Sequence, residues 1–383
     1  MNNKKKTSIS QKVLISAFII LFFGLSLAFI ILPDKTFSEN ENRALSSFPE
    51  FSFKALFFEG YTSEISDYCS DQFPFRDTFI NIKSLGELAL LKGESGGIVL
   101  GKDGNLISDI GVADENLIKE NLSHIDAFSK KTDAQVYTAF VPTSSYVLSS
   151  YLPKSYPVAQ INKFYTILGN NLPENVSNID LYPTLSEHSS EYIYYKTDHH
   201  LTSLGAYYVY CELITSLGGT PYALSEFTRE VASTEFYGTT WSFAGIPFIS
   251  PDDLELFRFK GDSDYTVTIN GKKTQTGLYD LSALDTKDKY SAFVTSTVNG
   301  KIEITSSSNT ETILLIKDSF SHAVAPFLAR HYNIVMIDTR YHTILKNSLT
   351  SLIEEENISK VIFLMGAQGV FDTSGKLYTL RNN

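Results

Sequence analysis

The sequence predicts a three-layer α/β/α domain with a β-rich insertion, preceded by one transmembrane helix at the amino terminus. The first observation is the segment Val13–Leu32, which carries no charge. The second is an alternation of short apolar runs with amphipathic segments on both sides of residues 222–310, because strands that alternate with helices form a sheet covered on both faces. The third is composition: residues 222–310 are rich in Thr, Ser, Phe and Tyr and contain several turns, which predicts an irregular insertion of strands.

The amino-terminal segment is long enough to cross a bilayer. Val13–Leu32 has 20 residues, and a spanning helix needs about 20. Four lysines lie among residues 1–12, and such a basic flank stays in the cytoplasm. The alternative is a cleaved signal peptide, with an apolar region of about 7–15 residues and a small-residue cleavage site. The segment runs into Pro33 without such a site, so we expect an uncleaved anchor and a chain beyond it that lies outside the cytoplasm.

The elements of the exported part follow from the spacing of apolar residues. Residues 57–91 show helical spacing and are interrupted at Pro74, which predicts two helices. Asp103-Gly104 lies between two apolar runs and predicts a hairpin over residues 98–107. Further helices are predicted over residues 114–132, 161–172, 204–217, 322–331 and 344–356, and strands over residues 134–141, 178–181, 312–316, 334–337 and 361–364.

We expect a juxtamembrane helical region over residues 33–97 and the main domain over residues 98–383.

Composition and charge narrow the class of protein. With 43% hydrophobic and 13% aromatic residues, the 383-residue chain can bury a sizeable core. A formal charge of −11 argues against nucleic-acid binding, because phosphate backbones select Lys and Arg. Cys69 and Cys211 have no zinc-binding spacing, and a disulfide between them stays open because their separation is unknown.

Two short motifs carry chemistry. Asp198-His199-His200 places a carboxylate two residues before an imidazole, and Ser319 follows the apolar run Thr312–Ile316. In nucleophilic hydrolases and transferases a histidine takes the proton of a serine and an aspartate orients the histidine. A serine at the carboxyl end of a strand lies where open α/β sheets bind ligands, and the following helix offers free N–H groups to an oxyanion. We therefore expect Ser319 as nucleophile, His200 as base and Asp198 as the orienting carboxylate.

Two other interpretations compete with this triad. Ser and Asp are common helix caps, so Ser319 and Asp198 could simply begin helices. A metal site is the other, with Asp198, His199, His200 and His322 as ligands. Neighbouring residues of a strand point to opposite faces, so His199 and His200 would not converge on one ion. We expect no metal.

Thr197-Asp198-His199-His200 resembles the signature of the DHHW-motif proteins, relatives of the alginate O-acetylation proteins (the AlgX/AlgJ group) with an SGNH-hydrolase-like fold. Other segments resemble that family in the same order along most of the exported part. They are Asn42–Leu45, Phe48-Pro49, Tyr68–Arg76, Gly101–Gly104, Phe236–Thr239, Lys317–Phe320, Pro326–Leu328 and Asp338–Tyr341. Leu201 stands where the family has tryptophan, so we expect any ring stacking on the Asp-His pair or on a sugar to be lost.

The resemblance also implies residues around the triad. It places the Ser319 N–H in the oxyanion hole and Arg340 and Tyr341 in contact with a glycan or the oxyanion. A structural salt bridge and a packed aromatic ring are the alternatives for those two residues. We group His199 with them in substrate binding. An SGNH enzyme usually has an Asn that completes the oxyanion hole, and here Asn299 is a loose candidate for that donor.

For function, the resemblance implies a membrane-anchored, extracytoplasmic O-acetyltransferase that acts on a cell-surface polysaccharide and needs no cofactor. A membrane-embedded acyltransferase would supply the acetyl groups. An acetylesterase is the second interpretation, because it uses the same three residues and differs only in letting water reach the acyl-enzyme. The third is a glycan-binding or assembly protein with a degenerate triad.

Overall fold

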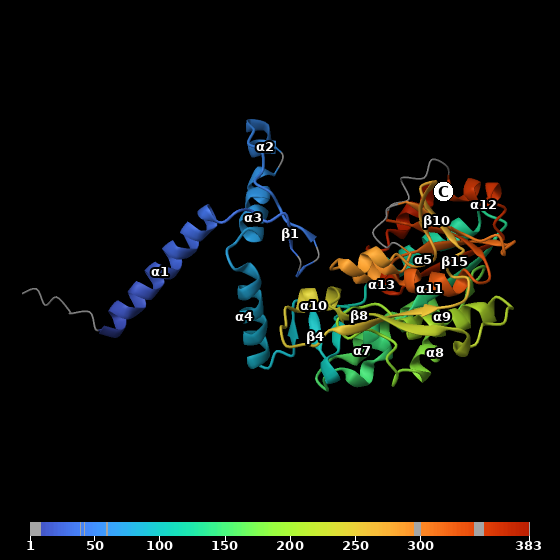
Figure 1. The fold of residues 1–383 in the computed structure, drawn as a ribbon, viewed down its shortest axis with the longest axis horizontal. Coiled ribbons are helices and arrows are strands. Elements are labelled where there is room, and N and C mark those ends of the chain that lie inside the picture. Colours follow the sequence, from blue (N-terminus) through green and yellow to red (C-terminus); the bar gives the residue numbers. More distant parts are fainter. Residues whose placement is uncertain are drawn as a thin grey trace, which may run out of the picture. The chain divides into compact units, whose positions relative to one another are not determined.

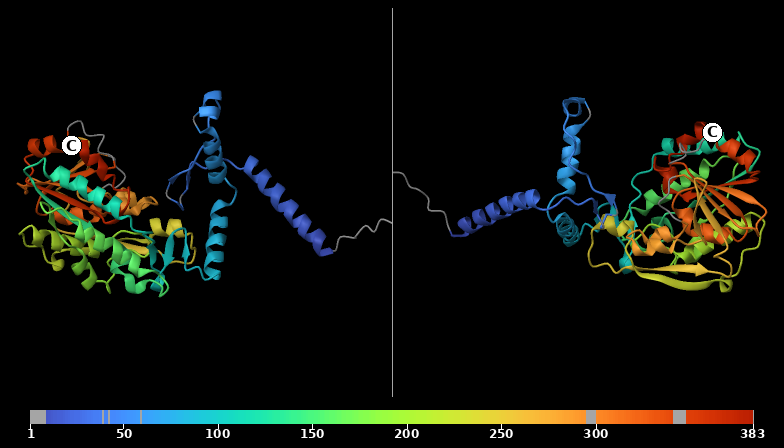
Figure 2. Two further views of the ribbon diagram at one scale, coloured as in Figure 1. Left: turned by 180° about the vertical axis from the view of Figure 1, so that it is seen from behind. Right: turned by 45° about the horizontal axis from the view of Figure 1, so that its top comes forward.

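The computed structural model describes residues 9–382 except residues 39, 42, 59, 295–299 and 341–347. The chain divides into two compact units, residues 1–90 and residues 91–383. Figure 1 labels their helices and strands, and Figure 2 gives two further views.

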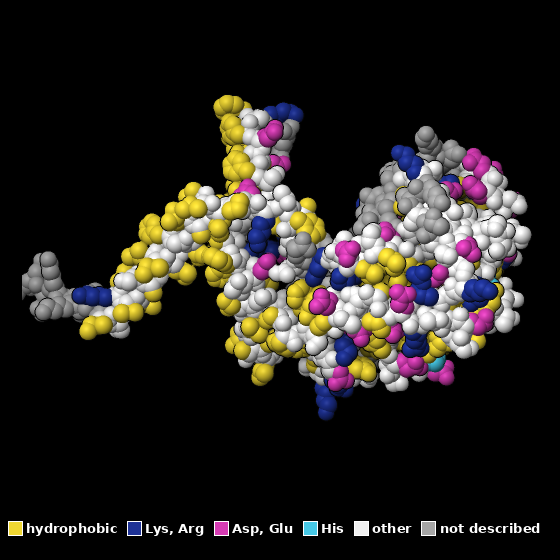
Figure 3. Space-filling model, in the orientation of Figure 1, with side chains coloured by type: hydrophobic (Ala, Val, Ile, Leu, Met, Phe, Trp, Pro, Cys, Tyr) yellow, Lys and Arg dark blue, Asp and Glu magenta, His cyan; other side chains and the backbone are white. Residues whose placement is uncertain are grey.

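The amino-terminal unit begins with a long apolar helix, α1 (Ile9–Ile31). Figure 3 shows hydrophobic side chains along this helix, and none of its side chains is buried. In the part of the chain that the structure describes, α1 is the one helix with the length and composition to cross a membrane. The helix starts four residues before the predicted span, Val13–Leu32, and ends one residue before it.

The predicted pair of helices with a break at Pro74 is present. Phe75 directly follows this proline and has a positive φ of 58°, so the backbone turns sharply before the second helix starts. The regular elements of the unit after α1 are β1 (Phe37–Ser38), β2 (Arg43–Ala44), α2 (Phe53–Phe58), α3 (Tyr61–Asp71) and α4 (Arg76–Ala89).

Ion pairs join the two amino-terminal motifs that carry the family resemblance. Arg43 of β2 binds Asp71 at the end of α3, with Nη2 2.5 Å from Oδ1. Arg76 at the start of α4 binds Glu41, with Nη1 2.7 Å from Oε1. The Asp71 carboxylate also accepts the N–H of Ser46 at 2.9 Å. These contacts tie the extended segment to α3 and α4 and give the two motifs a structural role.

The second unit is built on an eight-stranded sheet of order β11-β10-β12-β14-β13-β15-β6-β7. The strands from β14 to β7 in this order pair in parallel, whereas β12, β10 and β11 are antiparallel to their neighbours. The sheet strands are β6 (Gln135–Val141), β7 (Ser177–Asn178), β10 (Thr266–Ile269), β11 (Lys272–Thr276), β12 (Lys301–Thr305), β13 (Thr312–Lys317), β14 (Asn333–Asp338) and β15 (Lys360–Gly366).

Both faces of the sheet are buried, as the alternation along β13 shows. Ile313 and Leu315 belong to one hydrophobic core, and Leu314 and Ile316 belong to another, because successive side chains of a strand point to opposite faces. The first core is completed by α9 (Ser203–Ser216) and α11 (Phe320–Leu328). The second is completed by α5 (Glu115–Ser129), α7 (Val158–Asn170), α12 (Leu349–Glu355) and α13 (Gln368–Phe371). The predicted three-layer α/β/α architecture is confirmed.

Residues 222–310 contribute strands to two sheets. Strands β8 (Thr228–Phe236) and β9 (Asp252–Arg258) form an antiparallel pair of their own, with α10 (Thr239–Ala244) between them. Strands β10, β11 and β12 instead extend the central sheet. The composition and turns of this region predict strands but do not say which sheet the strands join, because pairing partners lie far apart in the sequence.

The remaining elements of the second unit lie outside the central sheet. The predicted hairpin over residues 98–107 is formed, and its turn places Asp103 and Gly104 at φ of 56° and 77°. The helix predicted over residues 344–356 is α12, and the first residues of that range lie outside the described residues. The other elements outside the central sheet are β3 (Glu94–Ser95), β4 (Ile98–Leu100), β5 (Leu106–Ser108), α6 (Ser144–Val147) and α8 (Tyr182–Glu187).

Candidate active site

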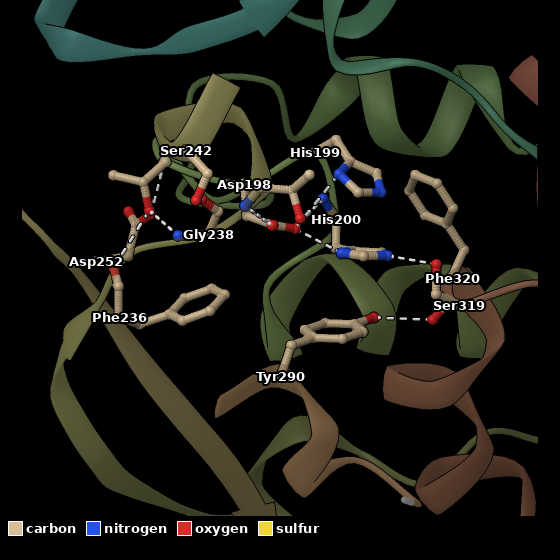
Figure 4. A network of polar contacts seen from close by, with 12 residues as sticks. Asp198, His199, His200, Phe236, Gly238, Ser242, Asp252, Tyr290, Ser319 and Phe320 are labelled. Carbon is tan, nitrogen blue, oxygen red and sulfur yellow. Dashed lines mark hydrogen bonds and ion pairs between the residues drawn. The ribbon is translucent and has the colours of Figure 1, made fainter. Parts of the chain in front are cut away.

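Ser319 lies between the end of β13 and the start of α11, at the carboxyl edge of the parallel strands. It occupies the N-cap position directly before α11, but its hydroxyl makes no capping hydrogen bond. The Ser319 Oγ lies instead 2.6 Å from Nε2 of His200 (Figure 4). The capping interpretation of Ser319 is therefore wrong, and the residues predicted as nucleophile and base are in direct contact.

His200 and Asp198 lie in a tight loop whose ends are joined by a bridge between Tyr194 and Leu201. His200 Nδ1 is 2.5 Å from Asp198 Oδ1. An ionised carboxylate only accepts hydrogen bonds, so we assign the ring proton to Nδ1. Nε2 then presents its lone pair to the Ser319 hydroxyl, as a general base must.

Asp198 is buried and held by hydrogen bonds on both oxygens. Its Oδ1 also accepts the His200 N–H at 2.9 Å, and its Oδ2 accepts the Thr239 N–H at 2.6 Å. Burial alone raises the pKa of this carboxyl, but His200, His199 and the Thr239 N–H outweigh burial and lower the pKa below its ordinary value. Asp198 is thus an anion that can stabilise an imidazolium. The capping interpretation of Asp198 is wrong, because Thr202 caps α9 by accepting the Gly205 N–H.

Gly238 packs directly against Asp198, and replacing it with alanine is expected to damage the site. A Cβ at this position would lie 2.2 Å from Cβ and 2.3 Å from Oδ2 of Asp198, so the carboxylate must move. A misplacement of about 1 Å in a catalytic group costs about a hundredfold in rate. We expect Gly238→Ala to lower kcat for acetyl ester hydrolysis by that factor. Gly169→Ala is the matched control, because a Cβ there meets nothing within 4 Å, and equal losses in both variants would contradict the prediction.

Tyr290 contacts both ends of the His200–Ser319 pair. Its ring stacks on the His200 imidazole with centroids 4.1 Å apart and planes at 11°, and its hydroxyl donates to the Ser319 carbonyl at 3.2 Å. Leu201 is fully buried. The expectation that its presence in place of tryptophan removes ring stacking from the pair is wrong, because Tyr290 supplies a ring from a distant segment.

Tyr290→Leu is expected to lower kcat more than Tyr290→Phe. The phenylalanine keeps the ring that fixes the imidazole plane and loses only the hydroxyl. The leucine loses the aromatic contact as well, which is worth about 0.5–1.5 kcal/mol and therefore about two- to thirteenfold in rate if it acts only in the transition state. Steady-state kinetics on both variants, with thermal unfolding as a check of the fold, would test this. A Phe variant as slow as the Leu variant would assign the effect to the hydroxyl.

His199 and His200 lie close together, contrary to the argument made against a metal. Their ring centroids are 3.9 Å apart, because these residues form bends rather than a strand. The potential ligand atoms of Asp198, His199 and His200 lie within 4.8 Å of one another. Both ring nitrogens of His200 are already hydrogen bonded, to Asp198 and Ser319, so a cation would compete with the triad. Burial and then the neighbouring His200 lower the pKa of the half-buried His199.

His322 is not part of this cluster and belongs to a buried network below Ser319. Its Nδ1 donates to the Phe293 carbonyl at 3.2 Å, so its Nε2 accepts from Lys317 Nζ at 2.7 Å. Lys317 Nζ also lies 3.3 Å from Asp338 Oδ2, and the side chains of Lys317 and Asp338 are both buried. The network links the ends of β13 and β14 to the first turns of α11, and so fixes the strand end that carries Ser319.

Among the residues predicted for substrate binding, some are described by the structure and others are not. Arg340 forms a two-pronged ion pair with Asp338, with Nε 2.8 Å from Oδ1 and Nη2 2.5 Å from Oδ2. This ion pair is the salt bridge that was the alternative to substrate binding by Arg340. A role of Arg340 in substrate binding stays a prediction. Tyr341 and Asn299 lie outside the described residues. Both cysteines are free thiols.

Asp318 fixes the backbone around the serine. Its Oδ1 accepts the Phe320 N–H at 2.9 Å and its Oδ2 accepts the Gly366 N–H at 2.8 Å, which joins the serine turn to the end of β15. The Ser319 N–H has no acceptor among residues 9–382 as far as the structure describes them. It is therefore the backbone donor available to an oxyanion next to the serine.

Sequence reasoning missed Asp252, which organises the loop that carries Asp198. The buried Asp252 carboxylate accepts the N–H groups of Lys196 at 3.0 Å and Thr197 at 2.7 Å, and the Thr197 hydroxyl at 2.5 Å. It also accepts the hydroxyl of Tyr192. Nothing around Asp252 in the sequence marks it. The Phe236–Thr239 motif, in contrast, did signal the segment that holds Asp198.

The fold and this constellation define a class: a three-layer α/β/α protein with a serine after a parallel strand and an Asp-His pair facing it. The chain belongs to the DHHW protein family, whose model matches residues 105–338, more than half of the chain. No curated protein sequence matches it.

Two solved structures show the same fold, and a third is less similar. A DHHW family protein from Eubacterium siraeum is 24% identical, with a TM-score of 0.62, and the match covers 76% of this chain and 96% of that one. PatB1 of Bacillus cereus, solved with a sulfonyl adduct, is 22% identical, with a TM-score of 0.59 and coverage of 73% and 98%. The O-acetyltransferase domain of Pseudomonas putida AlgJ is less similar, at 18% identity and a TM-score of 0.46 over 75% and 99% of the two chains.

Proposed function

We propose that this protein is a membrane-anchored, extracytoplasmic acyltransferase that acetylates a cell-surface polysaccharide. One observation carries the proposal: an unbroken hydrogen-bonded chain from Asp198 through His200 to Ser319, with links of 2.5 and 2.6 Å. Both links connect the atoms that base-assisted attack by a serine requires. These hydrogen-bonded residues lie at the sheet edge where α/β proteins bind ligands.

In the first half-reaction, Ser319 Oγ attacks the carbonyl carbon of the acyl donor while His200 Nε2 takes the hydroxyl proton. The Asp198 carboxylate stabilises the imidazolium that results. The Ser319 N–H, beside the amino terminus of α11, donates to the oxyanion of the tetrahedral intermediate. The intermediate collapses to an acyl ester on Ser319, and the leaving group of the donor takes the proton back from His200.

In the second half-reaction, His200 removes a proton from a sugar hydroxyl, which attacks the acyl ester. Collapse of the second intermediate gives the acylated sugar and returns the proton to Ser319. The same steps with water in place of the sugar give an esterase. The two activities share every residue of the triad, so the acceptor that reaches the acyl-enzyme decides between them.

The acyl group, the acceptor and the location are proposed from the family resemblance and from α1. The resemblance to the alginate O-acetylation proteins suggests acetyl and a polysaccharide, and a membrane-embedded acyltransferase would supply the acetyl donor. The α1 helix (Ile9–Ile31) is long and apolar enough to be an anchor. In this arrangement the short stretch before α1 is cytoplasmic, and both the helical region and the α/β domain lie outside the membrane.

The test is whether Ser319 becomes acetylated. Full-length protein in detergent would be mixed with an activated acetyl ester, quenched with acid, digested and examined by mass spectrometry. We expect the peptide that contains Ser319 to gain one acetyl group, and added oligosaccharide to speed its loss and to appear as acetylated product. Release of acetate without this sugar product would favour the esterase. Absence of any acetyl group on Ser319 would favour a binding or assembly protein.

A further inference from the structure

The amino-terminal unit leaves its apolar side chains in contact with solvent. Among the described residues, twelve large hydrophobic side chains are exposed over residues 33–90, and eight of these are phenylalanine. The much longer stretch of residues 91–383 exposes eight. No Leu, Ile, Phe or Tyr side chain that the structure describes in residues 33–90 is buried. This part of the unit therefore lacks an apolar core of its own, and its apolar side chains need a partner outside it.

The exposed side chains form a continuous face on α4. Phe75, Phe79, Ile82 and Leu85 lie directly before or within this helix and are 63%, 41%, 59% and 42% exposed. Because an α-helix has about 3.6 residues per turn, their spacing of three and four residues puts them on one side, and the charged residues of α4 lie on the other. Figure 3 shows hydrophobic side chains over the helices of this unit. Single exposed apolar residues are ordinary, but a continuous apolar face marks contact with a protein or a membrane.

Contacts with the end of α1 hold this part of the chain near the point where α1 would leave the bilayer. Phe29, in the last turn of α1, packs edge-on against Tyr68 of α3 with ring centroids 5.9 Å apart. The Tyr68 hydroxyl donates to Asp34 Oδ1 at 3.1 Å. Gln72 accepts the Lys35 N–H and donates to the Lys35 carbonyl, both at 2.9 Å. Because Gln72 directly follows α3 and α4 begins four residues later, these contacts also keep the start of α4 next to the end of α1.

We infer that the apolar face of α4 rests on the outer surface of the phospholipid bilayer that α1 crosses, with its side chains in the headgroup layer. An apolar face of phenylalanine and leucine beside a charged face is typical of helices that lie in this layer. With 14 residues, α4 is too short to span, which takes about 20. Residues 51–90 carry three basic and six acidic residues, a net charge of −3, so apolar burial rather than attraction to anionic lipids holds the helix there. The inference rests on the membrane anchoring in the proposed function, and not on its chemistry.

Spin labels on the full-length protein in phosphatidylcholine vesicles test this placement. Both native cysteines would be changed to serine, and a label attached at Ile82→Cys or, as the matched control, at Lys83→Cys. The two positions adjoin and are similarly exposed, at 59% and 63%. Collisions with oxygen, which dissolves in lipid, and with a water-soluble nickel complex give the depth of each label. We expect the label at position 82 about 5–10 Å below the headgroup surface and the label at position 83 in water.

Two results at position 82 would overturn the inference. Nickel collisions as frequent as at position 83 would place the face in water. Loss of both oxygen and nickel collisions would place it against protein, such as a second copy of this chain. A label at Ile19→Cys, within α1, separates this inference from the anchoring: a label there in lipid with position 82 outside lipid leaves the anchor standing and refutes the placement of α4. Frequent nickel collisions at position 19 would refute both, while the acetylation of Ser319, measured separately, still decides the chemistry.

Discussion

Ser319→Ala is expected to lower the rate of acetyl ester hydrolysis and of acetyl transfer by about 10⁴-fold or more, the size seen when a triad serine is removed. The loss is large because the hydroxyl that His200 polarises at 2.6 Å is the only atom that can carry the acyl group in the proposed mechanism. The remaining rate would come from the oxyanion donor and from binding. Initial rates with an activated acetyl ester would measure the effect.

The fold should survive this change. The Ser319 side chain caps no helix, so thermal unfolding should be close to that of the unmodified protein. Ser308→Ala, at an exposed turn, is the control and should keep full activity. If Ser319→Ala keeps most of its activity, Ser319 is not the nucleophile.

Asp198→Asn is expected to cost about 10⁴-fold in kcat, as in serine-hydrolase triads where the same change leaves the geometry intact. An amide in this position can donate to His200 Nδ1, which places the ring proton on Nε2. The imidazole then faces the Ser319 hydroxyl with a proton rather than with a lone pair. The carboxylate now accepts the Thr239 N–H at 2.6 Å. An asparagine has only one acceptor oxygen, and that oxygen would have to take over this hydrogen bond.

Combining the changes gives a sharper test than either change alone. Residues that act as one unit lose their effect together, so Ser319→Ala with Asp198→Asn should be about as slow as Ser319→Ala alone. Asp133→Asn, at an exposed position, controls for loss of one charge. Losses that multiply in the double variant would show that Asp198 acts independently of the serine, for example through stability.

The sequence reveals the parallel part of the fold because its strands are continuous apolar runs. Strands buried on both faces lose the alternation of exposed strands, and β13 and β15 stand out for that reason. The position of Ser319 at a strand end follows from this, and so does its expected place at the sheet edge. For residues 222–310 the sequence predicted only a β-rich insertion without placing its strands, and their addition to the central sheet depends on pairings that local pattern does not encode.

The candidate site was predictable where its residues belong to short motifs, as Asp198 and His200 do and as Ser319 does after its strand. Asp198 and His200 form a motif, whereas Tyr290 and Asp252 reach them from other segments through single contacts. The argument that the side chains of His199 and His200 point in opposite directions assumed that both residues lie in a strand. They lie in a loop, so the argument does not apply to them. Backbone conformation therefore decided which side chains converge, and that conformation is set by tertiary hydrogen bonds.

The distance along the chain between the base and the nucleophile has a consequence for timing. His200 and Ser319 are 119 residues apart, and Asp318 must join the serine turn to Gly366 of β15 before that turn is fixed. A chain synthesised from its amino end thus carries the Asp-His pair long before the serine exists. The serine turn is therefore fixed only when β15 is paired with β13. Reactivity at Ser319 should report that this part of the sheet has formed.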